Sequence, residues 1–73
     1  MVIGFSASDE LGAAIRRARQ ARGLRLEDVA LAAGVGIRFL SELERGKETA
    51  RLGETLRVVR ALGLTLWAED PLG

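Results

Sequence analysis

Residues 26–44 read LEDVALAAGVGIRFLSELE, and this stretch predicts two short helices, 26–33 and 36–44, joined by a tight turn. Two helices that cross steeply need a small side chain where they touch, and Ala30 provides one in the first helix. Four residues later the chain has to turn with a positive φ, which Gly34 adopts at little energetic cost. The stretch therefore fits a pair of crossed helices.

Apolar residues stand at the positions that hold such a crossed pair together, which predicts a helix-turn-helix unit over residues 26–44. In this unit the second helix turns its outer face to solvent, so Ile37 and Arg38 are expected to be exposed. The residues predicted to be buried in the whole chain are Val29, Ala30, Val35, Leu40, Leu43, Leu56 and Val59.

Helical spacing of apolar residues on both sides of this unit predicts further helices. One begins near Ser6 or Ser8, either of which can cap it, and ends at Gly23. Another is capped by Thr49 and ends at Gly63. Its inward residues are expected to be Leu52, Leu56, Val59 and Leu62.

The tail changes to a period of two, because residues 64–68 alternate and include strand-forming types. A lone strand needs a partner for its backbone groups, either residues 2–5 or the same segment of a second copy. We favour the second copy, since symmetric pairing also enlarges a small core. The predicted dimer interface consists of Leu64, Thr65, Leu66 and Trp67, although Trp67 can also serve a partner protein.

Composition excludes several function classes. The chain lacks cysteine and histidine, so a disulfide, a thiolate metal site and a histidine base are all excluded. No nucleophile–base pair or phosphate-binding loop is visible, and we expect neither an enzyme nor a cofactor or metal. The segment 1–5 is too short for a signal peptide and no apolar run could span a membrane, so a cytoplasmic, nucleoid-associated protein is expected.

Several motifs together resemble the Cro/repressor (XRE) family over residues 11–64. They are the runs 11–16 (LGAAIR), 23–24 (GL), 34–35 (GV), 40–47 (LSELERGK) and 62–64 (LGL). Within the family, the small size and the strand-like tail are most similar to the HipB-type antitoxins. The resemblance implies an all-α, lambda-repressor-like fold of four to five helices with one short C-terminal strand, forming one domain over residues 1–73.

The resemblance also implies a function. It predicts a dimeric, sequence-specific repressor that binds a palindromic operator in double-stranded DNA and autoregulates its operon. A HipB-type protein would in addition neutralise a HipA-type serine/threonine kinase toxin. The alternative is a protein-interaction module with reduced or lost DNA binding, which fits the net charge of only +1. It also fits Arg25 and Leu26, which stand where the family usually has threonine or serine followed by glutamine.

The third helix of this fold enters the major groove with its N-terminal side chains facing the bases. There Arg38 can bind guanine through O6 and N7, or remain a solvated arginine paired with Glu42. Ile37 can contact a thymine methyl group or pack on the core. Glu42 is expected to pair with Arg38 or to accept from a cytosine amine. The predicted DNA-binding residues are Arg25, Gly36, Ile37, Arg38, Ser41, Glu42, Arg45 and Lys47.

The resemblance implies one more contact, which is structural. Members of this family often join the first helix to the end of the third by an ion pair, and here that pair would be Arg19 and Glu44. We expect it to be buried or half-buried.

Overall fold

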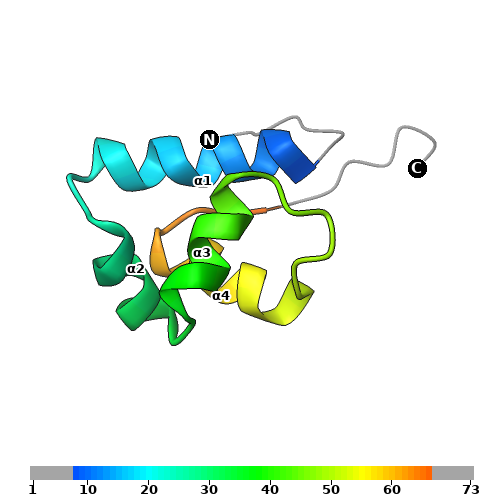
Figure 1. Ribbon diagram of the computed structural model, residues 1–73. Helices are drawn as coiled ribbons and strands as arrows, with labels where there is room; N and C mark the ends of the chain where they lie inside the picture. The colour runs from blue at the N-terminus through cyan, green and yellow to red at the C-terminus, as the bar shows by residue number, and fades with distance from the viewer. Residues whose placement is uncertain (1–7, 67–73) are drawn as a thin grey trace.

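The computed structural model describes residues 8–66, and these residues form four helices: α1 (Ser8–Ala21), α2 (Leu26–Ala33), α3 (Ile37–Glu44) and α4 (Leu52–Ala61). Helix α1 packs on α3, while α2 packs on both α3 and α4 (Figure 1). The expected all-α class is confirmed, with four helices in the described part of the chain. No helix within 8–66 is long and apolar enough to cross a membrane.

The turn between α2 and α3 has the geometry that the sequence predicts. Gly34 adopts φ 69° and ψ 38°, a left-handed conformation that ends α2. The next N–H, that of Val35, donates to the carbonyl of Ala30 at 3.0 Å and closes the turn. Ala30 is only 2% exposed, as its place at the helix crossing requires.

The start of α2 is capped by an acid instead of a hydroxyl. The Asp28 carboxylate accepts the backbone N–H of Arg25 at 2.8 Å. This contact is the acidic half of a capping box, and a guanidinium cannot supply the other half because it has no acceptor atom. The N–H of Arg25 and its guanidinium lower the pKa of Asp28. The helix start therefore survives the loss of the usual threonine or serine.

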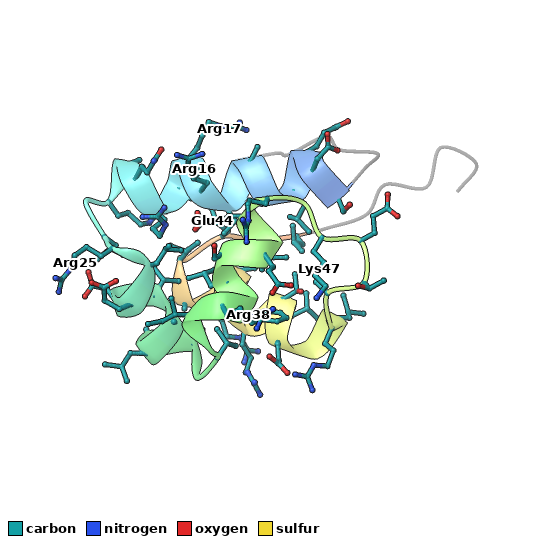
Figure 2. The ribbon with its side chains drawn as sticks, in the orientation of Figure 1. Arg16, Arg17, Arg25, Arg38, Glu44 and Lys47 are labelled. Carbon is teal, nitrogen blue, oxygen red and sulfur yellow. The ribbon has the colours of Figure 1, made fainter. Side chains whose placement is uncertain are left out.

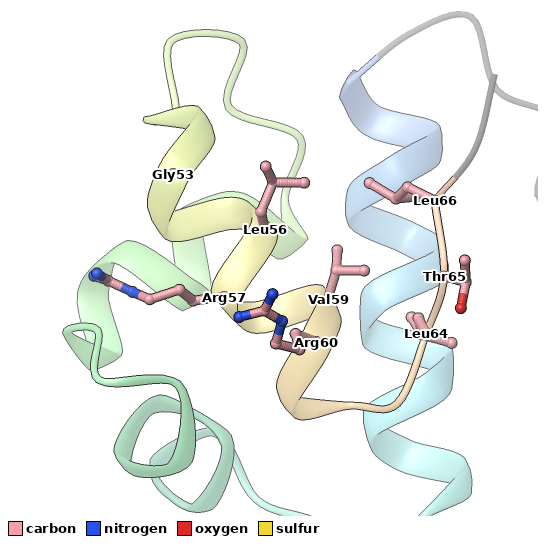
Figure 3. A pocket seen from close by; sticks show the side chains of 8 residues that line it. All are labelled: Gly53, Leu56, Arg57, Val59, Arg60, Leu64, Thr65 and Leu66. Atoms are coloured by element: carbon pink, nitrogen blue, oxygen red, sulfur yellow. The ribbon is translucent and has the colours of Figure 1, made fainter.

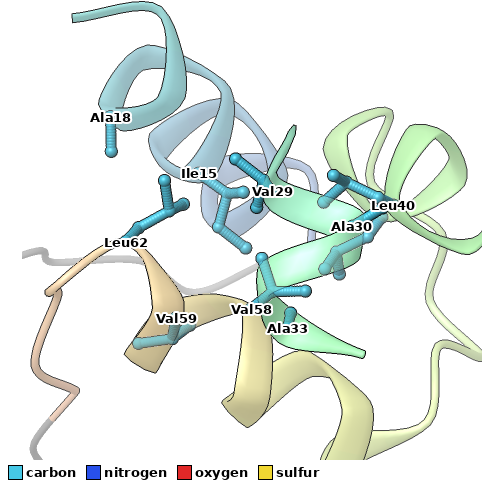
Figure 4. Packing of buried hydrophobic residues seen from close by; sticks show 10 residues of the cluster. Ile15, Ala18, Val29, Ala30, Ala33, Leu40, Val58, Val59 and Leu62 are labelled. Atoms are coloured by element: carbon cyan, nitrogen blue, oxygen red, sulfur yellow. The ribbon is translucent and has the colours of Figure 1, made fainter. Parts of the chain in front are cut away.

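The core forms where all four helices meet. Figure 4 shows Ile15 from α1, Val29 from α2, Leu40 from α3 and Val58 from α4 packed around this centre. Each has almost no exposed surface. Of the seven residues predicted to be buried, five are confirmed: Val29, Ala30, Leu40, Leu43 and Val59.

Val35 is half-buried, and the prediction for α4 is wrong in phase. Leu52 is 71% and Leu56 45% exposed. Thr49 is not the cap either, because α4 begins at Leu52 with Arg51 as its cap residue. The inner face of α4 is formed by Thr55, Val58, Val59 and Leu62.

A buried threonine explains the error of phase. The Thr55 hydroxyl donates to the carbonyl of Arg51 at 2.8 Å, so its polar group is satisfied inside the helix. A threonine with a satisfied hydroxyl can be buried at small cost. The spacing of Leu52 and Leu56 therefore misplaced the inner face, because Thr55 was not considered a core residue.

The tail follows α4 directly. The N–H of Leu64 donates to the carbonyl of Val59 at 3.0 Å. Leu64 and Leu66 are half-buried and Thr65 is exposed, which is the alternation expected of this segment. Residues 64–66 form no strand within the described chain, and the rest of the predicted strand and its candidate partner 2–5 lie outside the described residues. Pairing with a second copy therefore stays a prediction.

Helices α1 and α3 approach closely at a glycine. A Cβ on Gly12 would lie 2.8 Å from the carbonyl oxygen of Glu44, and it would also collide with that of Leu43. Nearby, the Ser8 hydroxyl donates to the carbonyl of Gly46 at 2.8 Å. The N-terminal half of α1 thus rests directly on the C-terminal end of α3.

Replacing Gly12 with alanine should destabilise the protein by about 1–3 kcal/mol, because the added methyl group forces two backbones apart. Gly53→Ala is the matched control, since Gly53 is also helical but its Cβ would meet nothing within 4 Å. That variant should be neutral or up to about 1 kcal/mol more stable. Urea unfolding at equal protein concentration measures both, and equal effects would contradict the close contact.

Candidate nucleic-acid interface

The first turn of α3 presents two exposed side chains on a helix that is anchored from behind. The Arg38 side chain is 93% exposed and Ile37 is 52% exposed. Leu40 and Leu43 on the opposite face are buried, so the turn is held firmly against the core. Gly36 precedes the helix and makes no side-chain cap, which leaves the first N–H groups of α3 without a side-chain partner.

Glu42 binds two cations on this surface. Its Oε1 accepts from Arg38 Nε at 3.0 Å, and its Oε2 accepts from Lys47 Nζ at 2.6 Å. The Lys47 contact and then the Arg38 contact lower the pKa of Glu42. The expected pairing of Glu42 with Arg38 is present, and the additional pairing with Lys47 was not predicted. One carboxylate therefore offsets much of the positive charge beside the α3 face.

The other predicted contact residues fall into two groups. Arg45, at the end of α3, shares a shallow pocket with Glu42, Gly46 and Lys47, and Ser41 is half-buried on the same helix. Arg25 stands apart at the start of α2 (Figure 2). It pairs there with Glu27 and Asp28, both at 3.4 Å. The structure thus gathers the residues of α3 and the following turn, while Arg25 marks a separate edge.

The ion pair predicted between Arg19 and Glu44 is present and bidentate. Arg19 Nε lies 2.7 Å from Oε2 of Glu44, and Nη2 lies 3.0 Å from Oε1. The side chains are only 12% and 6% exposed. Nη1 of Arg19 also donates to the carbonyl of Leu24 at 2.9 Å. These contacts, the Glu44 hydrogen bonds first, raise the pKa of Arg19.

Two features of the site were missed from the sequence. Lys47 lies five residues after Glu42 and beyond the end of the helix, so no helical spacing rule pairs them. Gly12 supports the end of α3, but a glycine within a helix gives no signal of what approaches it. Arg16 and Arg17 are exposed as well, but they extend from α1 away from the other helices (Figure 2).

Comparisons with known sequences agree with this geometry. A family model for a helix-turn-helix domain matches residues 10–70. The chain is 42% identical over 57 residues to the uncharacterised HTH-type transcriptional regulator y4mF of Sinorhizobium fredii, covering 78% of this chain and 75% of that protein. It is 40% identical over 52 residues to the HTH-type transcriptional regulator DdrOP3 of Deinococcus deserti, covering 71% of this chain and 40% of that longer protein.

Solved structures share the fold. A HipB–O4 20mer complex superposes with a TM-score of 0.85 at 19% identity, covering 93% of this chain and 96% of that one. A HipA–HipB–O2–O3 complex gives 0.86 at the same identity and coverage. The restriction-modification controller protein C.AhdI from Aeromonas hydrophila gives 0.67 at 30% identity, covering 74% of this chain and 82% of that one. At 19% identity, the HipB likeness is a likeness of fold.

Removing one partner of the Arg19–Glu44 pair should cost several kcal/mol. Glu44→Gln is expected to lower the free energy of unfolding by about 3 kcal/mol, since it leaves a half-buried guanidinium without its counter-charge. Glu27→Gln is the control, because the Arg25–Glu27 pair is 74% and 52% exposed. An exposed pair contributes at most about 1 kcal/mol. Thermal or urea unfolding that gives similar losses for both variants would show that burial of the pair adds nothing.

Proposed function

The chain belongs to the helix-turn-helix family of transcriptional regulators, of the Cro/repressor (XRE) type with a HipB-like fold, and we propose that it is a sequence-specific repressor. In this proposal it binds double-stranded operator DNA as a homodimer. The observation that carries the proposal is the exposed first turn of α3, with Arg38 93% exposed above a buried inner face. A helix held this way can enter a major groove without rearranging the core.

Arg38 is proposed to read the sequence. Its guanidinium can donate to O6 and N7 of one guanine, a contact that discriminates by about 1–3 kcal/mol. Ile37 is assigned to a thymine methyl group, because its exposed position costs nothing to cover with DNA. The contacts proposed to position the backbone come from Arg25, the N–H of Gly36, Ser41, Arg45 and Lys47.

A homodimer provides the spacing of the two recognition helices. Two-fold symmetry predicts inverted half-sites about one helical turn apart, or ~34–36 Å. We assign the interface to residues 64–67, in which Leu64 and Leu66 retain exposed apolar surface within a single chain. The described chain has few buried residues for its length, so association would add core that one copy lacks.

A more specific role is that of an antitoxin which represses its own operon and neutralises a HipA-type serine/threonine kinase toxin. The fold shared with HipB, including a HipA–HipB–O2–O3 complex, supports this role. The alternative, a protein-interaction module with weak DNA binding, is supported by Glu42, which occupies two cations of the α3 surface. Gel shift on the DNA upstream of the gene, and co-purification with the product of the adjacent gene, separate the two.

Arg38→Ala should reduce binding to the upstream duplex much more than binding to a random duplex of equal length. The side chain is proposed to contact a base, so its loss removes specificity. Lys47→Ala should weaken both duplexes alike, because a phosphate contact carries no sequence information. Titrations at several salt concentrations measure both effects. Equal losses on the two duplexes from both variants would refute this division of roles.

Glu42→Gln should strengthen binding to the random duplex and steepen its salt dependence. Glutamine keeps the shape of Glu42 but releases Arg38 and Lys47 from their ion pairs. Each cation that newly meets a phosphate adds about 0.9 to the slope of log affinity against log salt. Glu54→Gln removes the same charge from a pair with Arg51 on α4 and serves as the control. If both variants bind random DNA equally, Glu42 does not restrain the α3 cations.

A further inference from the structure

We propose that the groove between α4 and residues 64–66 is the docking site for Trp67 of a second copy of this chain. The inference rests on the proposed homodimer and identifies the receptor surface on α4 that accepts the partner's tail. It assigns a role to Leu56, Arg57 and Arg60, which neither the core nor the DNA surface uses.

The groove has an apolar floor and is open to solvent. It encloses about 590 Å³ and is lined on its apolar side by Leu56, Val59, Leu64 and Leu66. In Figure 3, Leu56 from α4 and Leu66 from the tail border the same open space. Leu56 is 45% exposed although its neighbour Val59 is 4% exposed. The volume lies within the range of about 300–1,000 Å³ typical of ligand sites, so a large aromatic side chain fits.

The rim of the groove is basic. Arg57 and Arg60 line it, both are exposed, and neither forms an ion pair within residues 8–66. An occupant that combines a large apolar side chain with nearby carboxylates would therefore satisfy both floor and rim. The sequence that follows Leu66 has this composition: Trp67, Ala68, Glu69 and Asp70.

The direction of the tail side chains favours a second copy over the same chain. Leu64 and Leu66 line the groove and are half-buried, whereas Thr65 is exposed. In an extended chain successive side chains point to opposite sides, so continued alternation turns Trp67 to the side of Thr65. That side faces away from the chain's own groove. A two-fold axis then gives each groove the Trp67 of the other subunit, a symmetric exchange that uses both sites.

Trp67 is the only tryptophan, so its fluorescence reports on the site directly. Wild-type emission should shift to shorter wavelength as protein concentration rises through the dimer dissociation constant measured by sedimentation. Leu56→Glu should raise that constant by about tenfold or more and keep the emission at long wavelength. Leu52→Glu is the matched control, since Leu52 is 71% exposed on the same helix outside the groove. Circular dichroism checks that both variants fold.

Mixing two defective variants tests whether docking occurs between subunits. Leu56→Glu loses the groove and Trp67→Ala loses the occupant, but a mixed dimer keeps one intact pair. The mixture should therefore dimerise more strongly than either variant alone, with a blue shift from the Leu56→Glu chain. No rescue, or a Leu56→Glu variant as dimeric as Leu52→Glu, overturns the groove assignment while leaving the homodimer intact. A wild-type chain that is monomeric at all concentrations overturns the homodimer itself, and a monomer with blue-shifted emission shows docking within one chain.

Discussion

The Arg19–Glu44 ion pair holds together the parts of the fold on which the exposed turn of α3 depends. Arg19 is on α1 and Glu44 is the last residue of α3, while a third hydrogen bond from Arg19 reaches the loop before α2. Charges this well covered lose most of their hydration, so the pair stabilises only because every bond is made in the right geometry. Gly12 allows the approach, since any side chain there would separate the helices. Helix α3 is thus anchored at its C-terminal end, and its N-terminal end is free to bind.

Electrostatics limit how strongly that free end attracts DNA. The chain carries a net charge of only +1, and Glu42 pairs with both Arg38 and Lys47. Non-specific affinity comes mainly from phosphate contacts made by unpaired cations. A surface whose cations are already paired therefore gains most from contacts that can replace the carboxylate, such as a guanine opposite Arg38. In the proposed function, weak general attraction and a few directional contacts favour specificity.

The sequence predicts the central part of this structure better than its margins. Ala30 and Gly34 could be identified because a steep crossing and a positive φ each restrict the residue type severely. The Arg19–Glu44 pair came from the family resemblance, since no local spacing joins residues so far apart in the chain. Helix α4 was predicted with the wrong face because the Thr55 hydroxyl is satisfied by the carbonyl of Arg51 and can be buried. The Glu42–Lys47 pair depends on the turn after α3, which spacing rules do not describe.

The central claim is that α3 reads a DNA sequence as part of a symmetric dimer. Selection of the 73-residue chain on a pool of random duplexes, followed by sequencing of the bound fraction, tests it most directly. The account predicts an enriched site with two inverted, guanine-containing half-sites whose centres lie about 10–10.5 base pairs apart. A pool that stays unenriched, with equal binding to all sequences, would contradict it.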